Sequence, residues 1–280
     1  MIMKKILAAL VTVSGLALAA PASAVVVGGI DFGVLGENPT NSHIDTSTLA
    51  QTYVNGDGQN ATSYGVITSI NGDTTYCAGN GTCGLFYVAT FTGSQNFSPS
   101  YVEFTGATYS VYYTSNASLL NLLTQSSASD IAAITGMTPW LTLTGHNNLG
   151  GGAASNAVLN GAGVLTGNTL SGAGFGLLDV NTGGPGLASV IAYLNSNGVA
   201  DAAGGFADMA VTSSFNNFVL NSFDNTTGCT TGQAAVGQWC YQGTANFRGS
   251  TNNIPEPGGL ALFAIALVGL GVSTRSRKAQ

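Results

Sequence analysis

Residues 107–113, with the sequence ATYSVYY, decide the fold. Odd-numbered positions in this stretch hold Ala, Tyr, Val and Tyr, whereas even-numbered positions hold Thr, Ser and Tyr. Because successive side chains of a strand point to opposite faces, this alternation predicts a β-strand. Residues 85–91 (LFYVATF) are apolar on both faces, as is typical of a central strand in a sandwich. Together the two stretches indicate a mainly β domain.

Other stretches along the chain also predict strands. Strand-like composition recurs at residues 140–144, 174–180, 206–212 and 217–223. Turns are predicted between these runs by pairs such as Asn55-Gly56, Asn71-Gly72 and Asn160-Gly161. The glycine-rich residues 150–167 predict an irregular connection or a turn-rich pair of strands.

Short helices are expected at three places. Residues 117–125 are leucine-rich, residues 130–135 follow a Ser129 cap, and residues 186–195 open after Pro185. No repeat and no break in composition divides residues 25–254. The sequence therefore predicts a single, jelly-roll-like β-sandwich domain with a few short helices.

Residues 1–24 have the three parts of a secretory signal peptide. Lys4 and Lys5 provide a positive start, residues 6–20 form an apolar signal helix, and Ala22-Ser23-Ala24 ends in small residues. We expect cleavage between Ala24 and Val25, so that the mature chain begins at Val25.

Residues 255–280 form a second segment of three parts. The motif Pro255-Glu256-Pro257 comes first, residues 258–272 are apolar, and residues 273–280 carry Arg275, Arg277 and Lys278. Fifteen helical residues rise about 22 Å, less than the roughly 30 Å of a hydrocarbon core. We therefore expect a short transmembrane helix that spans the bilayer marginally. The three cations predict a stop-transfer signal that keeps the tail in the cytoplasm.

This layout resembles the PEP-CTERM sorting signal of Gram-negative bacteria that make exopolysaccharide. The resemblance implies processing near Pro255-Glu256-Pro257 by an exosortase-type membrane enzyme. It also implies a precursor held transiently in the inner membrane and a mature form at the cell surface or in the extracellular matrix. The chain then divides into a signal peptide at 1–24, an exported domain at 25–254 and a sorting signal at 255–280.

The late part of the exported domain carries four short stretches of Gly, Ala, Ser and aromatic residues. They are 193–197 (YLNSN), 203–208 (AGGFAD), 212–215 (TSSF) and 243–249 (GTANFRG). Together they resemble the flocculation-associated subgroup of PEP-CTERM proteins. This resemblance implies a role in the cohesion of flocs or biofilms and implies no chemistry.

Charge is scarce and acidic in the exported domain. Arg248 is the single Lys or Arg among residues 25–254, which contain eleven of the twelve acidic residues, so the formal net charge is −10. Such a domain repels nucleic acid and anionic lipid, which excludes both as partners. Its solubility must rest on uncharged polar residues, which suit a gel of neutral sugars.

The four cysteines form two local pairs. Cys77 and Cys83 flank a five-residue segment, and Cys229 and Cys240 flank a segment of ten. An even count in an exported chain favours disulfides, and of the three possible connectivities we expect the two local ones. A zinc site is the alternative, but neither pair has the usual Cys-x2-4-Cys spacing.

No set of residues predicts catalysis. His43 and His146 have no acid and nucleophile beside them in sequence, and the chain contains neither a Gly-x-Ser-x-Gly nor a His-Glu-x-x-His motif. Glu37 and Glu103 lie far apart in sequence and would have to meet in a cleft to act as a glycosidase pair. We therefore expect that the protein is not an enzyme.

Calcium is the one cofactor for which the sequence offers ligands. Residues 55–60 (NGDGQN) and 71–73 (NGD) place Asp and Asn oxygens on turns, but neither has the twelve-residue loop of an EF-hand. Asx turns explain both stretches without a metal, so we expect no cofactor.

The sequence thus predicts a non-enzymatic matrix protein that supports floc or biofilm cohesion with exopolysaccharide. The alternative is a carbohydrate-binding module or glycan-active enzyme that uses the same sorting signal. The positions of the rings of Trp140, Trp239 and the tyrosines discriminate between these two functions. Coplanar rings beside a groove would favour the alternative, whereas buried rings would favour the matrix protein.

Overall fold

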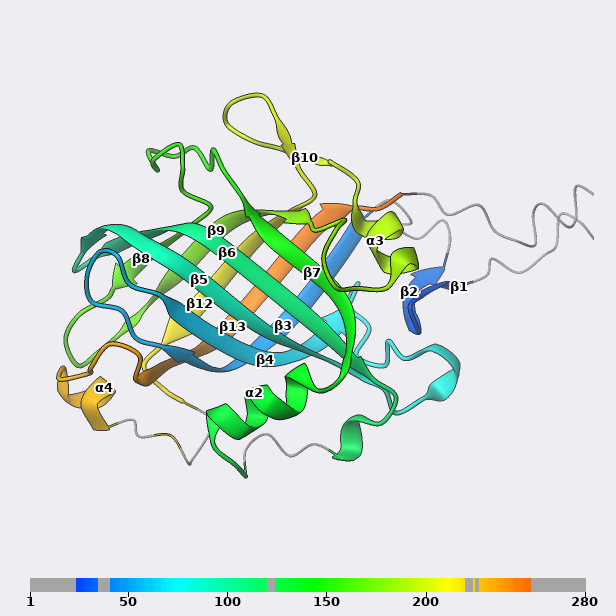
Figure 1. Ribbon diagram of the computed structural model, residues 1–280, viewed down its shortest axis with the longest axis horizontal. Helices are drawn as coiled ribbons and strands as arrows, with labels where there is room; N and C mark the ends of the chain where they lie inside the picture. Colours follow the sequence, from blue (N-terminus) through cyan, green and yellow to red (C-terminus); the bar gives the residue numbers. More distant parts are fainter. Residues whose placement is uncertain (1–23, 35–40, 120–123, 220–223, 225–226, 253–280) are drawn as a thin grey trace, which may run out of the picture. The chain divides into compact units, whose positions relative to one another are not determined.

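Nine antiparallel strands form one sheet that closes on itself (Figure 1). The computed structural model describes residues 24–34, 41–119, 124–219, 224 and 227–252. Strand β12 pairs with both β9 and β13, and β13 pairs with β3, so the two ends of the sheet meet. We call this assembly the closed sheet. Its strands are β3 (Asn41–Thr52), β4 (Ala61–Ile70), β5 (Gly84–Ser98), β6 (Tyr101–Thr114), β7 (Thr138–His146), β8 (Leu159–Val164), β9 (Ser171–Val180), β12 (Met209–Asn216) and β13 (Trp239–Ser250).

Strands β7 and β8 share one position in the closed sheet. Both lie between β6 and β9, but β7 pairs with the later part of each strand and β8 with the earlier part. The connection between β7 and β8, residues 147–158, therefore leaves the sheet and returns to the same place.

Smaller elements surround the closed sheet (Figure 1). Two short hairpins are β1 (Ala24–Val27) with β2 (Ile30–Val34), and β10 (Val199–Ala200) with β11 (Phe206–Ala207). The helical elements are η1 (Ala78–Asn80), η2 (Ala117–Leu119), α2 (Ser127–Thr135), α3 (Ala188–Leu194) and α4 (Thr227–Thr231).

Apolar side chains are buried on both surfaces of the closed sheet. The larger cluster includes Leu85, Tyr109 and Leu143 from the strands. A second cluster joins Ile134 of α2 to Tyr64 and other side chains of β3–β5. The helices thus cover two parts of the sheet, which protects apolar surface that a bare sheet would expose to water.

Trp140 anchors the layer outside β7. Its side chain is fully buried, and its indole N–H donates a hydrogen bond of 3.1 Å to the carbonyl of Gly28, in the turn between β1 and β2. The ring of Phe32 stacks on it with a centroid separation of 6.4 Å. This contact holds the β1–β2 hairpin against β7.

The mainly β character with few short helices is confirmed, but the two-layered, jelly-roll-like sandwich is wrong. The described strands of the core form one closed sheet instead of two sheets packed face to face. Alternation along a strand shows that one face is buried, and a sheet rolled on itself produces the same alternation.

Most of the predicted strands lie where the sequence places them. Residues 85–91, 107–113, 140–144 and 174–180 fall within β5, β6, β7 and β9. The run 206–212 is interrupted at Asp208, whose carboxylate accepts hydrogen bonds from the backbone N–H groups of Val180 and Asn197. Within residues 150–167, the irregular connection is followed by β8.

Three local predictions need correction. The strand expected at 217–223 is absent from its described residues 217–219, because the side chain of Asn216 accepts the N–H of Phe218 and forms a turn that ends β12. The helix expected at 117–125 is a single turn at Ala117–Leu119 in the described part. Helix α2 begins earlier than expected, and its cap is Ser126, whose side chain accepts the N–H of Ser129. Helix α3 is confirmed within the predicted range.

Candidate binding cavity and polar clusters

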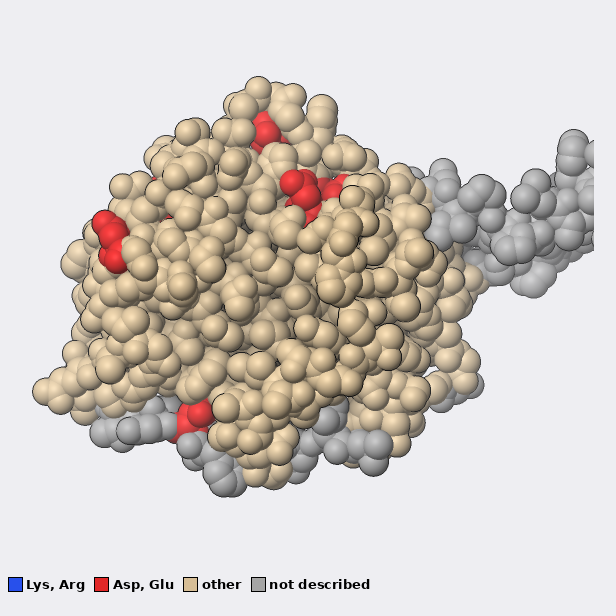
Figure 2. Space-filling model, in the orientation of Figure 1, with Lys and Arg blue, Asp and Glu red and all other residues tan. Residues whose placement is uncertain are grey.

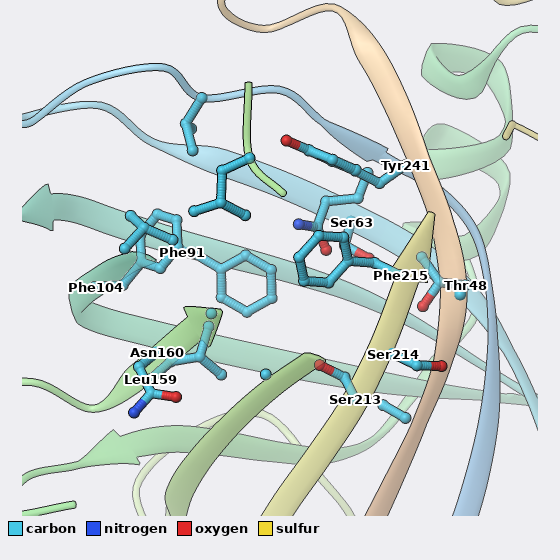
Figure 3. Close-up of a pocket in the computed structure, with 18 of the residues that line it drawn as sticks. Thr48, Ser63, Phe91, Phe104, Leu159, Asn160, Ser213, Ser214, Phe215 and Tyr241 are labelled. Atoms are coloured by element: carbon cyan, nitrogen blue, oxygen red, sulfur yellow. The ribbon is translucent and has the colours of Figure 1, made fainter. Parts of the chain in front are cut away.

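A cavity of about 70 Å³ lies inside the closed sheet (Figure 3). Aromatic rings form much of its wall, and those of Phe91, Phe215 and Tyr241 gather around it in Figure 3. Uncharged polar residues such as Thr48 and Ser213 complete the lining. Among the described residues that line the cavity, none carries a charge.

Glycines on β8 and β9 leave room for this cavity. Gly161 lies opposite Gly174, and Gly172 lies opposite Phe215 of β12. A side chain at Gly172 would collide with the Phe215 ring, so that ring fills the space beside Gly172. Gly161 differs, because a Cβ added there would lie 3.4 Å from Val102 Cγ1, an ordinary contact. The lining at Gly161 therefore has space that a larger side chain could occupy.

Three buried tyrosines line the cavity. The hydroxyl of Tyr87 lies 2.6 Å from Oγ1 of Thr48. The hydroxyls of Tyr109 and Tyr241 have no hydrogen-bond partner among the described residues, although these tyrosines are only 6 % and 4 % exposed. Burial raises the pKa of all three tyrosines, so their hydroxyls stay protonated and able to donate.

His146 lies between two carboxylates at the end of β7. Its Nδ1 is 2.9 Å from Oδ2 of Asp179, and its Nε2 is 3.0 Å from Oδ2 of Asp201. An ionised carboxylate only accepts hydrogen bonds, so both ring nitrogens must donate and the ring is an imidazolium. Burial alone would lower the pKa of His146, but the bonds to Asp201 and Asp179 outweigh it and raise this pKa.

Asp201 organises the loop between β10 and β11. It accepts the backbone N–H groups of Ala203 and Gly205 at 2.8 and 2.7 Å. The bond from His146, followed by these backbone bonds, lowers the pKa of Asp201 to about 2. The ion pair with His146 therefore fastens this loop to β7.

Glu103 is buried inside a cage of hydrogen-bond donors. It accepts bonds from the side chains of Gln95, Asn96 and Tyr101 and from the backbone N–H of Ala154, at 2.8–3.1 Å. Burial would raise the pKa of Glu103, but these bonds together lower it. Glu103 thus fixes the connection between β7 and β8 and is not placed as a glycosidase acid. Glu37 lies outside the described residues.

His43 lies on the outer surface of β3, far from His146 in sequence. Its Nε2 is 3.0 Å from Oδ1 of Asp45 and also contacts the side-chain oxygen of Asn246. The other carboxylate oxygen of Asp45 accepts the hydroxyl of Ser69 at 2.5 Å. Ser69 therefore bonds to the acid and not to the histidine, which is not the arrangement of a nucleophile and its base.

Of the two stretches considered for calcium, residues 71–73 lead into an Asx turn at Asp73, whereas Asp57 in residues 55–60 bonds to the distant strand β5 and forms no such turn. Asp57 accepts the N–H of Phe97 at 2.9 Å, and Asp73 accepts the N–H and hydroxyl of Thr75 at 2.7 Å each. The bonds from Thr75 lower the pKa of Asp73. Within the described residues, no three His, Cys, Asp or Glu side chains are grouped to hold a metal ion.

Both local disulfides are present. Cys77 bonds to Cys83 and Cys229 bonds to Cys240, as the spacing and compartment predict. The first closes the segment that contains η1, and the second ties α4 to β13. These bonds are consistent with an exported protein.

The predicted processing and membrane residues fall mostly outside the structure. Ala24 and Val25 begin β1, whereas Pro255-Glu256-Pro257, the apolar segment 258–272 and the cations Arg275, Arg277 and Lys278 lie outside the described residues. Within the described part of the chain, no helix combines the length and the apolar character needed to span a bilayer.

No single sequence motif predicts the cavity or the surroundings of His146. The cavity arises from inward-facing positions on eight strands, and the partners of His146 lie 33 and 55 residues away. Glycine at alternate positions of residues 172–176 is the one local sign that the closed sheet has room inside. No protein-family model, curated protein or solved structure matches this chain.

Proposed function

We propose that this protein is a non-enzymatic component of the bacterial cell surface or extracellular matrix that supports the cohesion of flocs or biofilms with exopolysaccharide. Its PEP-CTERM-like tail first anchors a precursor in the inner membrane, and an exosortase-type enzyme then releases the exported domain. The observation that carries the proposal is the burial of Trp140 and of most tyrosines, because a sugar-binding or sugar-cleaving site would need such rings at the surface.

The two tryptophans support this choice most directly. Trp140 is fully buried, and Trp239 is partly buried with its ring edge-on to Tyr64 at 5.6 Å. Sugar-binding sites commonly present flat rings to the apolar face of a sugar, and a ring held inside a core cannot do so. The arrangement favours a matrix protein over the alternative of a carbohydrate-binding module or glycan-active enzyme.

The surface also lacks dense charge. Figure 2 shows one face on which acidic atoms are scattered among uncharged residues and no basic atoms are visible in the described part. Several acids are held in internal hydrogen bonds, including Glu103, Asp201 and Asp208. An uncharged polar surface can lie in a hydrated polysaccharide gel without attracting polyanions.

Gene deletion with complementation tests the proposal. Cells that lack the gene should settle more slowly as flocs, and the wild-type gene should restore settling, with the protein detected by antibody in the matrix fraction. Purified exported domain should release no reducing sugar from the isolated exopolysaccharide. Normal flocculation in the deletion strain would contradict the matrix role, and sugar release by pure protein would establish the enzyme alternative.

A further inference from the structure

The cavity inside the closed sheet has the properties of a binding site. We propose that it binds a small uncharged molecule with an apolar body and one or two hydrogen-bonding groups. This inference is independent of the proposed role in the matrix, because it rests on the interior of the sheet and not on its surface.

The residues that line the cavity disfavour a charged ligand. The described residues around the cavity supply aromatic rings, aliphatic side chains, hydroxyls and amides, and none of them is charged. An ion that entered would lose its hydration without gaining an opposite charge, which is strongly unfavourable. A neutral molecule loses much less on entry and gains contact with the rings of Phe91, Phe104 and Phe215.

The unpartnered hydroxyls provide the polar contacts. Tyr109 and Tyr241 are both more than nine-tenths buried, line the cavity and have no hydrogen-bond partner among the described residues. Ser213, also in the lining, lies opposite Gly174, where a side chain would meet its Oγ. A ligand hydroxyl or carbonyl would give the tyrosine hydroxyls the partner that the protein does not supply.

The volume limits the ligand to a small molecule. About 70 Å³ is room for on the order of five water molecules at roughly 15 Å³ each. An engineered apolar cavity of about 150 Å³ in another protein holds benzene, so this cavity takes a molecule of about half that size. A sugar ring is too large, whereas a two-carbon alcohol such as ethanol, which has about half the non-hydrogen atoms of benzene, has a suitable size and polarity.

Saturation-transfer NMR with ethanol as the probe tests the site on the folded exported domain. We expect a saturable signal for ethanol and none for ethylammonium, which has a similar shape and a positive charge. Removal of the hydroxyl in Tyr241→Phe should weaken binding of ethanol by about two- to tenfold, the worth of one hydrogen bond.

Gly161→Val fills the cavity, and Ala162→Val is its matched control. The added side chain at Gly161 meets Val102 at an ordinary distance and extends into the lining, whereas Ala162 is the next residue of β8 and is exposed. Binding should be lost in Gly161→Val and kept in Ala162→Val, with both variants showing the wild-type circular dichroism spectrum. Should Gly161→Val fail to fold, Tyr241→Phe and the charged probe decide the question.

Three results would overturn the site. They are equal signals for ethanol and ethylammonium, equal binding of ethanol by wild type, Tyr241→Phe and Gly161→Val, and a crystal soaked in ethanol whose cavity contains ordered water alone. This experiment measures binding and not flocculation. Its outcome therefore does not test the proposed matrix role.

Discussion

At the scale of single residues, His146 is held between two carboxylates that favour its charged form. Both ring nitrogens contact carboxylates, and the side chain of Asp201 is only 4 % exposed while that of Asp179 is 40 % exposed. Removing one proton from the ring leaves a lone pair opposite one of these carboxylates. Because Asp179 is the more exposed of the two, it can turn toward water, and Asp201 keeps the remaining N–H.

The first prediction is a pH-dependent contribution of His146 to stability. Because the folded protein raises the pKa of His146, its contribution is fully present below the ordinary value of 6.5 and is lost as the pH rises through the folded value. Asp201 acts at the other end, since its pKa is lowered to about 2 and its contribution is lost as the pH falls through that value.

Thermal unfolding of wild type and His146→Gln between pH 5 and 9 measures this effect. At pH 5 the wild type should unfold at a higher temperature than His146→Gln, and this difference in unfolding temperature should shrink toward pH 9. His43→Gln, which removes the histidine of β3, is the matched control. A difference that stays constant across the range would mean that His146 acts by packing alone.

The second prediction concerns catalysis by histidine. His43→Ala and His146→Gln should each restore flocculation to the deletion strain as fully as wild type, because neither histidine bonds to a nucleophile in the described structure. Settling rate and antibody detection of exported protein are the measurements. A folded, exported His43→Ala protein that fails to restore settling would point to an enzyme.

Sequence indicated which residues could titrate, but not what they contact. His146 reads as an isolated loop histidine, because Asp179 and Asp201 come from later strands and loops that only the fold brings together. Glu103 likewise appears as a dispersed surface acid, yet four donors from β5, β6 and the β7–β8 connection surround it. Local cysteine spacing, in contrast, was sufficient to predict both disulfides.

At the scale of elements, each disulfide closes a short segment of the chain: Cys77–Cys83 the segment that contains η1, and Cys229–Cys240 the one between α4 and β13. The third prediction is that the intact exported domain has no free thiol and that proteolysis without reductant yields the Cys77–Cys83 and Cys229–Cys240 peptides. Replacing each pair by serine removes a loop constraint across 6 or 11 residues, which costs about 2 and about 3 kcal/mol respectively.

Urea unfolding of the two double variants measures these losses. Reduction of the wild type should lower its stability by about the sum of the two, and the same reductant should leave a variant lacking both pairs unchanged. Recovery of a Cys77–Cys229 peptide would contradict the local pairing.

Strands β5, β6, β7 and β9 were predicted from their apolar residues, whereas β3, β4 and β13 were missed. Strand β3 was missed because its inward face includes Ser42, Thr46 and Thr48. The hydroxyl of Thr46 forms hydrogen bonds with the backbone of Ala245 in β13, a partner about 200 residues away. Closure of the sheet depends on the same distant pairing of β13 with β3 and of β12 with β9, so no local pattern could distinguish it from a sandwich.

At the scale of the whole molecule, the proposed function assigns the location of the domain to the segments 1–24 and 255–280. The fourth prediction is that the mature surface form lacks residues 258–280. Replacing Pro255, Glu256 and Pro257 with alanine should leave the protein in the inner membrane with its tail attached, because the recognition motif is lost and the apolar segment is kept.

Deletion of residues 258–280 is the complementary variant. It should give a soluble periplasmic form that does not reach the matrix, because the anchor is lost. Fractionation with an antibody to the exported domain, and mass measurement of the mature form, follow both variants. Normal trimming and delivery of the triple-alanine protein would show that the motif does not direct processing.

Every strand of the closed sheet has a hydrogen-bonded neighbour on both sides. Open sheets end in strands whose free N–H and C=O groups can recruit strands from other molecules and seed fibres. In the proposed matrix role the protein would meet many copies of itself for long periods, and closure removes this route to fibre growth from the nine strands of the closed sheet. Contacts between such copies are then made by side chains and can be undone, so that a floc can disperse without its proteins having to unfold.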